Sequence, residues 1–114
     1  MPTLRLAQGT TSPTDWHDLP RGGIRVTVDT RRHGFTQVPH YLCTLEGEAH
    51  MWKAQGVNAV YNPAINSFQV ILKFVNERGA DGKPVELTAA YAKTHGWYLR
   101  YTAVYSEADE TASG

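Results

Sequence analysis

The side chains best suited to chemistry in this sequence are aromatic residues and histidines in its second half. An aromatic ring can stack on the apolar C–H face of a sugar, while neighbouring polar groups bind its hydroxyls. We therefore expect a ligand-binding patch in which Tyr91 or Tyr98 stacks and Lys93 and His95 hydrogen-bond hydroxyls. A second choice for the same role is Trp52 with His50. The candidate ligand-binding residues are Tyr91, Lys93, His95, Tyr98, Trp52 and His50.

Each aromatic residue also has a purely structural interpretation. Trp97 begins an alternating apolar stretch, "WYLRYTAVY", so it is expected in the core. Trp52 stands among polar neighbours between two glycines, and its pattern leaves core and ligand site equally open. Tyr98 and Arg100 fall on the opposite face of that last stretch, which indicates a surface role as ligand site or subunit contact.

Other constellations of reactive residues are weak. The histidines at 17, 33, 40, 50 and 95 lack zinc-motif spacing, so no metal site is predicted. Cys43 lies in an apolar run, which favours a buried thiol over a nucleophile. No catalytic triad or phosphate-binding loop is found, so no catalytic residue and no cofactor are predicted. "RRHG" at 31–34 could bind a carboxylate or a sugar acid, or could be an ordinary solvated turn.

The elements that must position these residues are strands. Ile24, Val26 and Val28 alternate with polar residues, and "NSFQVILKFV" and "WYLRYTAVY" show the same period of two. "PRGG" at 20–23 and "NERGADGKPV" at 76–85 have turn chemistry. "LTAAYAKTHG" predicts one short helical turn, with Thr88 as N-cap and Gly96 as the stop. About six short strands predict an all-β fold, a small antiparallel β-sandwich.

The length and the net charge of the chain bear on its domain organisation and on its partners. The chain has 114 residues, enough for one domain with its own core. We expect an extended N-terminal segment over 1–23 packing on the domain, a sandwich over 24–105, and a disordered acidic tail over 106–114. Net charge is zero, with 11 basic and 11 acidic residues, which argues against a nucleic-acid partner.

The sequence also bears on location. No apolar run approaches the ~20 residues that span a bilayer, so membrane insertion is not expected. The N-terminus has no apolar signal-peptide region, which predicts a cytoplasmic protein and leaves release by a non-standard route open.

Three stretches resemble the H-type lectin domain, the small β-sandwich of snail agglutinins and discoidins. They are "IRVTVDTRRHGFTQVPHYLCTLEG", "MWKAQGVNAVYNPAINSFQVILKF" and "THGWYLRYTAV". The resemblance covers about residues 24–104 and implies a six-stranded sandwich that assembles as a trimer or hexamer. Where that family carries a loop aspartate before its last strand, this chain offers Tyr91, Lys93 and His95.

We therefore expect a carbohydrate-binding, lectin-like module that recognises glycans multivalently as a homo-oligomer. One alternative is a structural or assembly module, such as a receptor-binding part of a phage tail or secretion apparatus, without sugar binding. The other alternative is a small enzyme with a pocket in the sandwich. A pocket holding two of His40, His50, His95, Glu46 or Glu86 would favour the enzyme.

Overall fold

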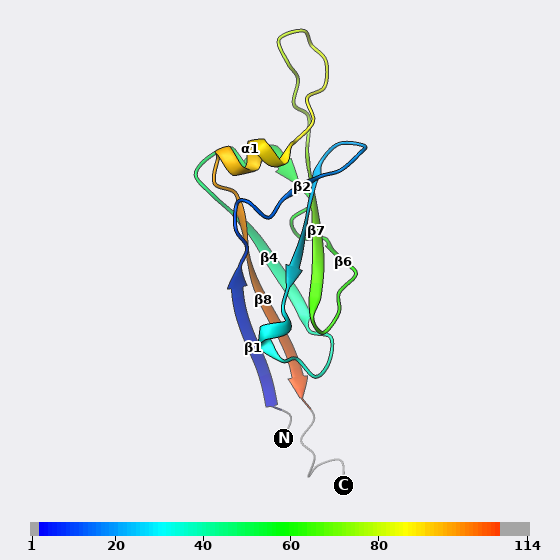
Figure 1. Cartoon of the computed structure of the whole chain (residues 1–114), viewed down its shortest axis with the longest axis vertical. Helices are drawn as coiled ribbons and strands as arrows, with labels where there is room; N and C mark the ends of the chain where they lie inside the picture. Colours follow the sequence, from blue (N-terminus) through cyan, green and yellow to red (C-terminus); the bar gives the residue numbers. More distant parts are fainter. Residues whose placement is uncertain (1–2, 108–114) are drawn as a thin grey trace.

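The computed structural model describes residues 3–107, which form two antiparallel β-sheets facing each other (Figure 1). Eight strands make up the sheets, one of three strands and one of five. The expected all-β sandwich is therefore confirmed. The chain is divided into more strands than the sequence pattern suggested because several pairings are only two residues long.

The three-stranded sheet has the order β1-β8-β4. Its strands are β1 (Thr3–Thr10), β8 (Tyr98–Glu107) and β4 (His40–Glu46). The long pairing of β1 with β8 makes residues 3–10 of the N-terminal segment an edge strand of this sheet. β8 also continues through residues 106 and 107, where a tail was expected; residues 108–114 lie outside the described part of the chain.

The five-stranded sheet is built on β7 (Ser67–Phe74), which pairs with β3 (Ile24–Asp29) along that strand's whole length. β2 (His17–Asp18) extends the sheet beyond β3. β5 (Ala54–Gln55) and β6 (Val60–Tyr61) both pair with β7 on its other side. A turn with Gly22 and Gly23 at positive φ joins β2 to β3, as the "PRGG" motif predicted.

The core lies between the sheets and follows the predicted alternation. It contains Ile24, Val26, Val28, Phe68, Val70, Leu72, Leu99, Tyr101 and Ala103. Burying each large apolar side chain contributes about 1.5–3 kcal/mol, which makes this layer the main source of stability. Two tryptophans close the core at one end: Nε1 of Trp16 donates to the Trp97 carbonyl at 2.9 Å, and Nε1 of Trp97 donates to the Ala49 carbonyl at 2.7 Å.

Two features cap the end of the sandwich where β7 finishes. α1 (Ala89–Thr94) lies across this end, and a hairpin over residues 76–85 projects beyond it (Figure 1). The hairpin is held by the Arg78–Pro84 bridge and by the Val85 N–H, which donates to the Glu77 carbonyl. Both the helical turn and the hairpin were predicted from the sequence.

The outer face of the three-stranded sheet departs from expectation. Leu4 and Leu6 belong to a segment expected to pack on the domain, but they are 63% and 60% exposed. Leu42 on β4 is 49% exposed on the same face. The reason is the register of β1. Arg5 and Ala7 face the interior side, so Leu4 and Leu6, which alternate with them, face outward.

Candidate ligand-binding site

Two ring-bearing residues of the predicted patch are positioned by α1. The helix begins as predicted, with Oγ1 of Thr88 accepting from the Tyr91 N–H at 3.2 Å. Oδ1 of Asp18 accepts from the Ala89 N–H at 2.6 Å, which docks the helix on β2. Gly96 ends the helix with φ +66, a conformation that glycine adopts without strain. One turn of helix separates Tyr91 from His95, so their rings meet, with centroids 4.4 Å apart.

His50 reaches the same place from the loop between β4 and η2 (Met51–Lys53). The Glu48 N–H donates to the His95 carbonyl at 2.9 Å, and this bond holds the loop against the end of α1. The His50 ring then meets the His95 ring edge to face, with centroids 4.7 Å apart, and lies 6.4 Å from Tyr91. We call His50, Tyr91 and His95 the ring cluster.

The backbone at His50 is unusual. Its φ of +69 lies in the left-handed region, which residues other than glycine rarely adopt. Such a conformation costs of order 1 kcal/mol and persists only where surrounding contacts fix it. Here the ring contact with His95 and the loop's bond to the His95 carbonyl are those contacts.

The ring cluster is fixed to the core on its inner side. Tyr91 packs edge to face against Phe74 at 5.1 Å and against Trp97 at 5.6 Å. Trp97 is fully buried, as the alternation predicted. The cluster is therefore a rigid platform, half-buried at Tyr91 and His95 and exposed at His50.

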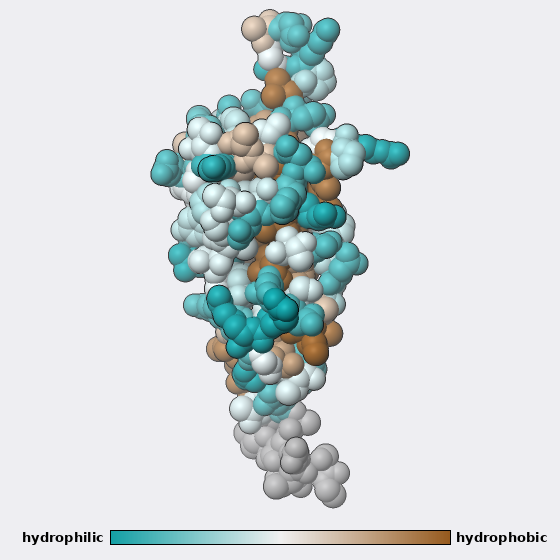
Figure 2. All heavy atoms as spheres, viewed as in Figure 1, coloured by the Kyte–Doolittle hydropathy of each residue, from teal (hydrophilic) through white to brown (hydrophobic). Residues whose placement is uncertain are grey.

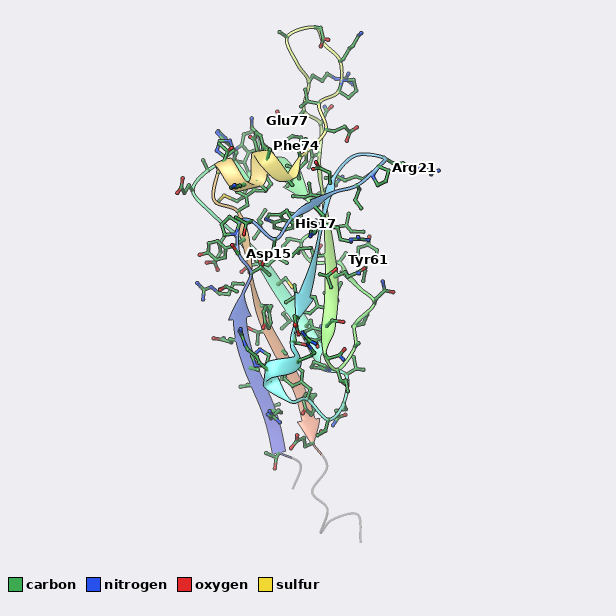
Figure 3. The ribbon with its side chains drawn as sticks, in the orientation of Figure 1. Asp15, His17, Arg21, Tyr61, Phe74 and Glu77 are labelled. Atoms are coloured by element: carbon green, nitrogen blue, oxygen red, sulfur yellow. The ribbon has the colours of Figure 1, made fainter. Side chains whose placement is uncertain are left out.

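Trp52, two positions after His50, is 78% exposed, more than any other large hydrophobic side chain between residues 3 and 107. Nζ of Lys53 lies 5.5 Å from its ring centroid, a cation–π contact. The same Nζ lies 3.4 Å from Oε2 of Glu77 at the base of the hairpin (Figure 3). Trp52 is therefore a surface residue and not a core residue, the two options that its sequence left open. The Lys53–Glu77 ion pair ties its segment to the base of the hairpin.

The other two predicted residues are placed differently. Lys93 is exposed on α1, next to the cluster in sequence. Tyr98 lies on the outer face of the three-stranded sheet, where its hydroxyl donates to Oε1 of Glu46 at 2.9 Å. Arg100 binds the same carboxylate at 2.7 and 3.1 Å. Within residues 3–107 no hydrogen bond or ring-to-ring contact joins Tyr98 to the ring cluster; its hydroxyl is engaged by Glu46 instead.

The electrostatics of these groups follow from their partners. The hydrogen bonds from Arg100 and then Tyr98 lower the pKa of Glu46. Burial raises the pKa of the Cys43 thiol to about 11, so this thiol stays protonated and unreactive at neutral pH.

The part of the chain from 3 to 107 contains no group of three or more His, Cys, Asp or Glu side chains arranged to hold a metal ion.

A cavity of about 640 Å³ lies elsewhere. Its lining includes none of the six predicted residues and none of the five that would have favoured an enzyme. It is lined mainly by Thr10, Thr11, Thr14, Asp15, Asp29, Arg32 and Tyr101. The sequence signals for it were slight: the "RRHG" turn contains Arg32, and threonines cluster near residue 10, but only the fold brings these segments together.

Comparison with protein-family models, curated proteins and solved structures finds no significant match to this chain. Between residues 3 and 107, no helix is long and apolar enough to cross a membrane.

Proposed function

We propose that this protein is a carbohydrate-binding module that uses the ring cluster and Trp52 to hold a sugar. The observation that carries the proposal is the meeting of His50, Tyr91 and His95 from two separate segments at the surface. Exposed rings offer a flat apolar face to the C–H side of a sugar at low entropic cost. Imidazole nitrogens next to them can both donate to and accept from hydroxyls.

The roles of the individual groups follow from their exposure. Trp52, with most of its side chain in solvent, would stack on the sugar. His50 and His95 would hydrogen-bond hydroxyls, and Lys93 would add a donor from α1. Tyr91 would support both imidazoles from beneath, since it is itself packed on Phe74 and Trp97. Such a shallow site binds weakly, so the proposal includes multivalent recognition by a homo-oligomer, a trimer or hexamer.

The outer face of the three-stranded sheet is the surface we propose for self-association with further copies of this chain. Leu4, Leu6 and Leu42 expose apolar side chains there, and monomeric proteins rarely leave such a patch open. A net charge of zero adds no repulsion between identical copies. The same face supports the second candidate function, an assembly module without sugar binding.

A glycan array on the intact protein, with its oligomeric mass measured in the same buffer, tests the proposal. Selective binding by an oligomer supports a lectin-like module. An oligomer that binds no glycan supports the assembly module instead. A monomer that binds no glycan contradicts both.

A further inference from the structure

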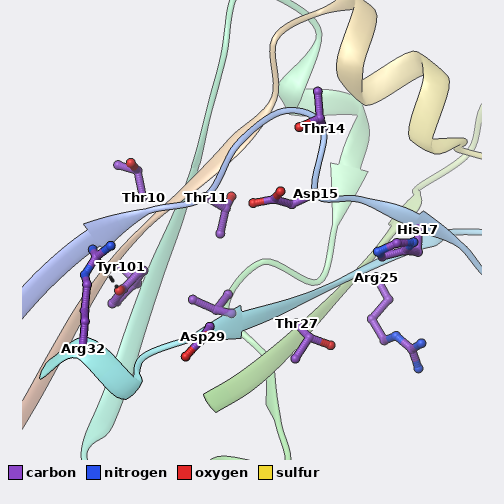
Figure 4. Close-up of a pocket in the computed structure, with 11 residues that line it drawn as sticks. Thr10, Thr11, Thr14, Asp15, His17, Arg25, Thr27, Asp29, Arg32 and Tyr101 are labelled. Carbon is purple, nitrogen blue, oxygen red and sulfur yellow. Dashed lines mark hydrogen bonds between the residues drawn. The ribbon is translucent and has the colours of Figure 1, made fainter. Parts of the chain in front are cut away.

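A polar cleft opens along one side of the sandwich, between the end of β1 and the edge of β3 (Figure 4). Its volume is about 640 Å³, which falls in the range typical of small-molecule sites. The segment that leads from β1 to β2 forms its upper rim and carries Asp15, and His17 at the start of β2 continues this rim. No residue of the ring cluster lines it, so it is a separate feature of the fold.

The open edge of β3 supplies main-chain groups to this cleft. β2 pairs with β3 only at Ile24 and Arg25. The Thr30 N–H donates to the Asn66 carbonyl on the β7 side, so even-numbered residues of β3 bond toward β7. The main-chain N–H and C=O of Thr27 and Asp29 therefore point away from β7, toward the cleft.

The upper rim adds hydroxyls and one carboxylate. Oγ1 of Thr11 accepts from the Leu99 N–H at 2.9 Å, which leaves its own hydroxyl proton available to a ligand. Oδ2 of Asp15 accepts from the Ser12 N–H at 2.8 Å. Its Oδ1 has no partner among the described residues. Thr10 and Thr14 line the cleft beside these groups (Figure 4).

The three cationic or titratable side chains of the "RRHG" turn are engaged to different degrees. Arg31 is paired with Asp29: its Nη2 donates to Oδ2 at 2.6 Å and its Nε donates to Oδ1 at 3.0 Å. Nε2 of His33 is 2.8 Å from the Tyr101 hydroxyl. Arg32 makes only a 3.5 Å contact with that hydroxyl, and no carboxylate in residues 3–107 forms a salt bridge with it.

The Arg32 side chain lies over Gly9 of β1, where no side chain blocks it. A Cβ atom on Gly9 would come within 2.6 Å of a guanidinium nitrogen of Arg32 and would collide with the Tyr101 hydroxyl. Glycine at this position therefore lets the guanidinium lie across β1. Figure 2 shows strongly hydrophilic residues gathered on this face where η1 (Arg31–His33) lies.

We propose that this cleft binds a monosaccharide-sized sugar acid, with Arg32 holding its carboxylate. A guanidinium without a carboxylate partner binds a carboxylate through paired charge-assisted hydrogen bonds. The Thr11 hydroxyl, Oδ1 of Asp15 and the main chain of Thr27 take the sugar hydroxyls. Val28 is the one aliphatic residue of the lining, so the cleft suits a hydroxyl-rich ligand better than the apolar side chains of a peptide. The proposal does not depend on the ring cluster.

Amide NMR titrations of the full chain with sodium glucuronate, galacturonate and N-acetylneuraminate test this, with glucose and galactose as neutral counterparts. We expect shifts at residues 10–15, 27–29 and 32. We also expect a uronate to bind at least about tenfold tighter than its neutral counterpart, because it gains hydrogen bonds to a charged group. The difference should shrink at high salt.

Two test variants and one control sharpen the test. Arg32→Gln should abolish the preference for the acid, while Arg21→Gln should retain it. Arg21 is the matched control because it is exposed at the tip of the β2–β3 turn (Figure 3). Gly9→Ala should weaken uronate binding by displacing Arg32 and the Tyr101 hydroxyl without removing the charge of Arg32.

Several outcomes overturn the proposal: equal affinity for glucose and glucuronate, no shift at the cleft, or an unchanged acid preference in Arg32→Gln. Shifts confined to His50, Tyr91 and His95 would also overturn it while supporting the ring cluster as a sugar site. Conversely, a Trp52→Ala variant that keeps uronate binding at the cleft and loses array binding separates the two sites.

Discussion

The imidazole rings of His50 and His95 meet edge to face with centroids 4.7 Å apart, although they lie on a loop and at the end of a helix far apart in sequence. The contact depends on a main-chain bond from Glu48 to His95 and on a left-handed backbone at His50. A strained residue whose ring is exposed, rather than buried for packing, is a feature found at functional sites.

That strain gives a direct test of the ring cluster. His50→Gly removes the ring and relaxes the backbone, because glycine adopts positive φ freely. We expect glycan binding to fall about three- to tenfold, the effect of losing a hydrogen bond and ring contact, with no loss of stability. Binding is measured on the best array ligand by calorimetry, and unfolding by denaturant titration. Full binding by a folded His50→Gly variant would exclude His50 from the site.

Tyr98 provides the matched comparison for the ring cluster. Tyr98→Phe removes only the hydroxyl that donates to Glu46 on the outer face of the sheet. We expect its glycan binding to equal that of the unaltered protein, whereas Trp52→Ala loses binding. Reduced glycan binding by a folded Tyr98→Phe variant whose oligomeric mass is unchanged would return Tyr98 to the site.

The buried hydroxyls of Thr30 and Tyr41 predict a stability effect. Oγ1 of Thr30 lies 3.0 Å from the Tyr41 hydroxyl, which donates to the Ala64 carbonyl at 2.6 Å. Tyr41→Phe leaves the Thr30 hydroxyl and the Ala64 carbonyl without this partner, so we expect a loss of about 1–3 kcal/mol in the free energy of unfolding. Tyr61→Phe, at an exposed tyrosine, is the control and should change it little. Equal effects from the two variants would contradict this account.

Cys43 should be unreactive in the native protein. Burial raises its pKa to about 11, so the thiolate is scarce at pH 8. We expect a thiol-specific chromogenic reagent to modify it slowly in buffer and rapidly in denaturant. Rapid native modification would show that β4 opens or that the thiol is accessible.

Asp29 should titrate at about pH 2, chiefly because the Arg31 side chain hydrogen-bonds its carboxylate. A carboxyl whose pKa is lowered by folding stabilises the protein above its unfolded pKa. That contribution is lost as pH falls toward 2. Carboxyl NMR titration measures the pKa directly, and Arg31→Gln should raise it toward the ordinary value of 3.8. An unchanged pKa in the variant would show that another group lowers it.

Self-association through the outer face of the three-stranded sheet predicts that Leu6→Glu lowers the oligomeric mass. Leu6 pairs with Val104 across the strands, so a carboxylate there would be buried without a partner in an interface. Light scattering after size exclusion measures the mass, with Thr27→Glu on the other sheet as control. An oligomer that persists in Leu6→Glu would place the interface elsewhere.

Local patterns in the sequence determined the elements of this protein. Alternation fixed which faces of 24–29, 67–74 and 98–104 are buried, because side chains of a strand point to opposite sides in turn. Capping chemistry placed α1 between Thr88 and Gly96, and glycines marked the turn before β3. These properties depend on residues close in sequence, so sequence alone was enough.

Tertiary structure decided which surfaces came together. The pairing of β1 with β8 turned Leu4 and Leu6 outward, because a strand's register depends on its distant partner. The contact between the His50 loop and His95 places His50 beside Tyr91. Tyr98 instead lies on the outer face of the three-stranded sheet, bonded to Glu46. The cleft at Arg32 exists because the fold brings the end of β1, the edge of β3 and the Arg32 side chain together, and Gly9 leaves room for that side chain. Contacts of this kind join segments that are far apart in the chain, and no local pattern encodes them.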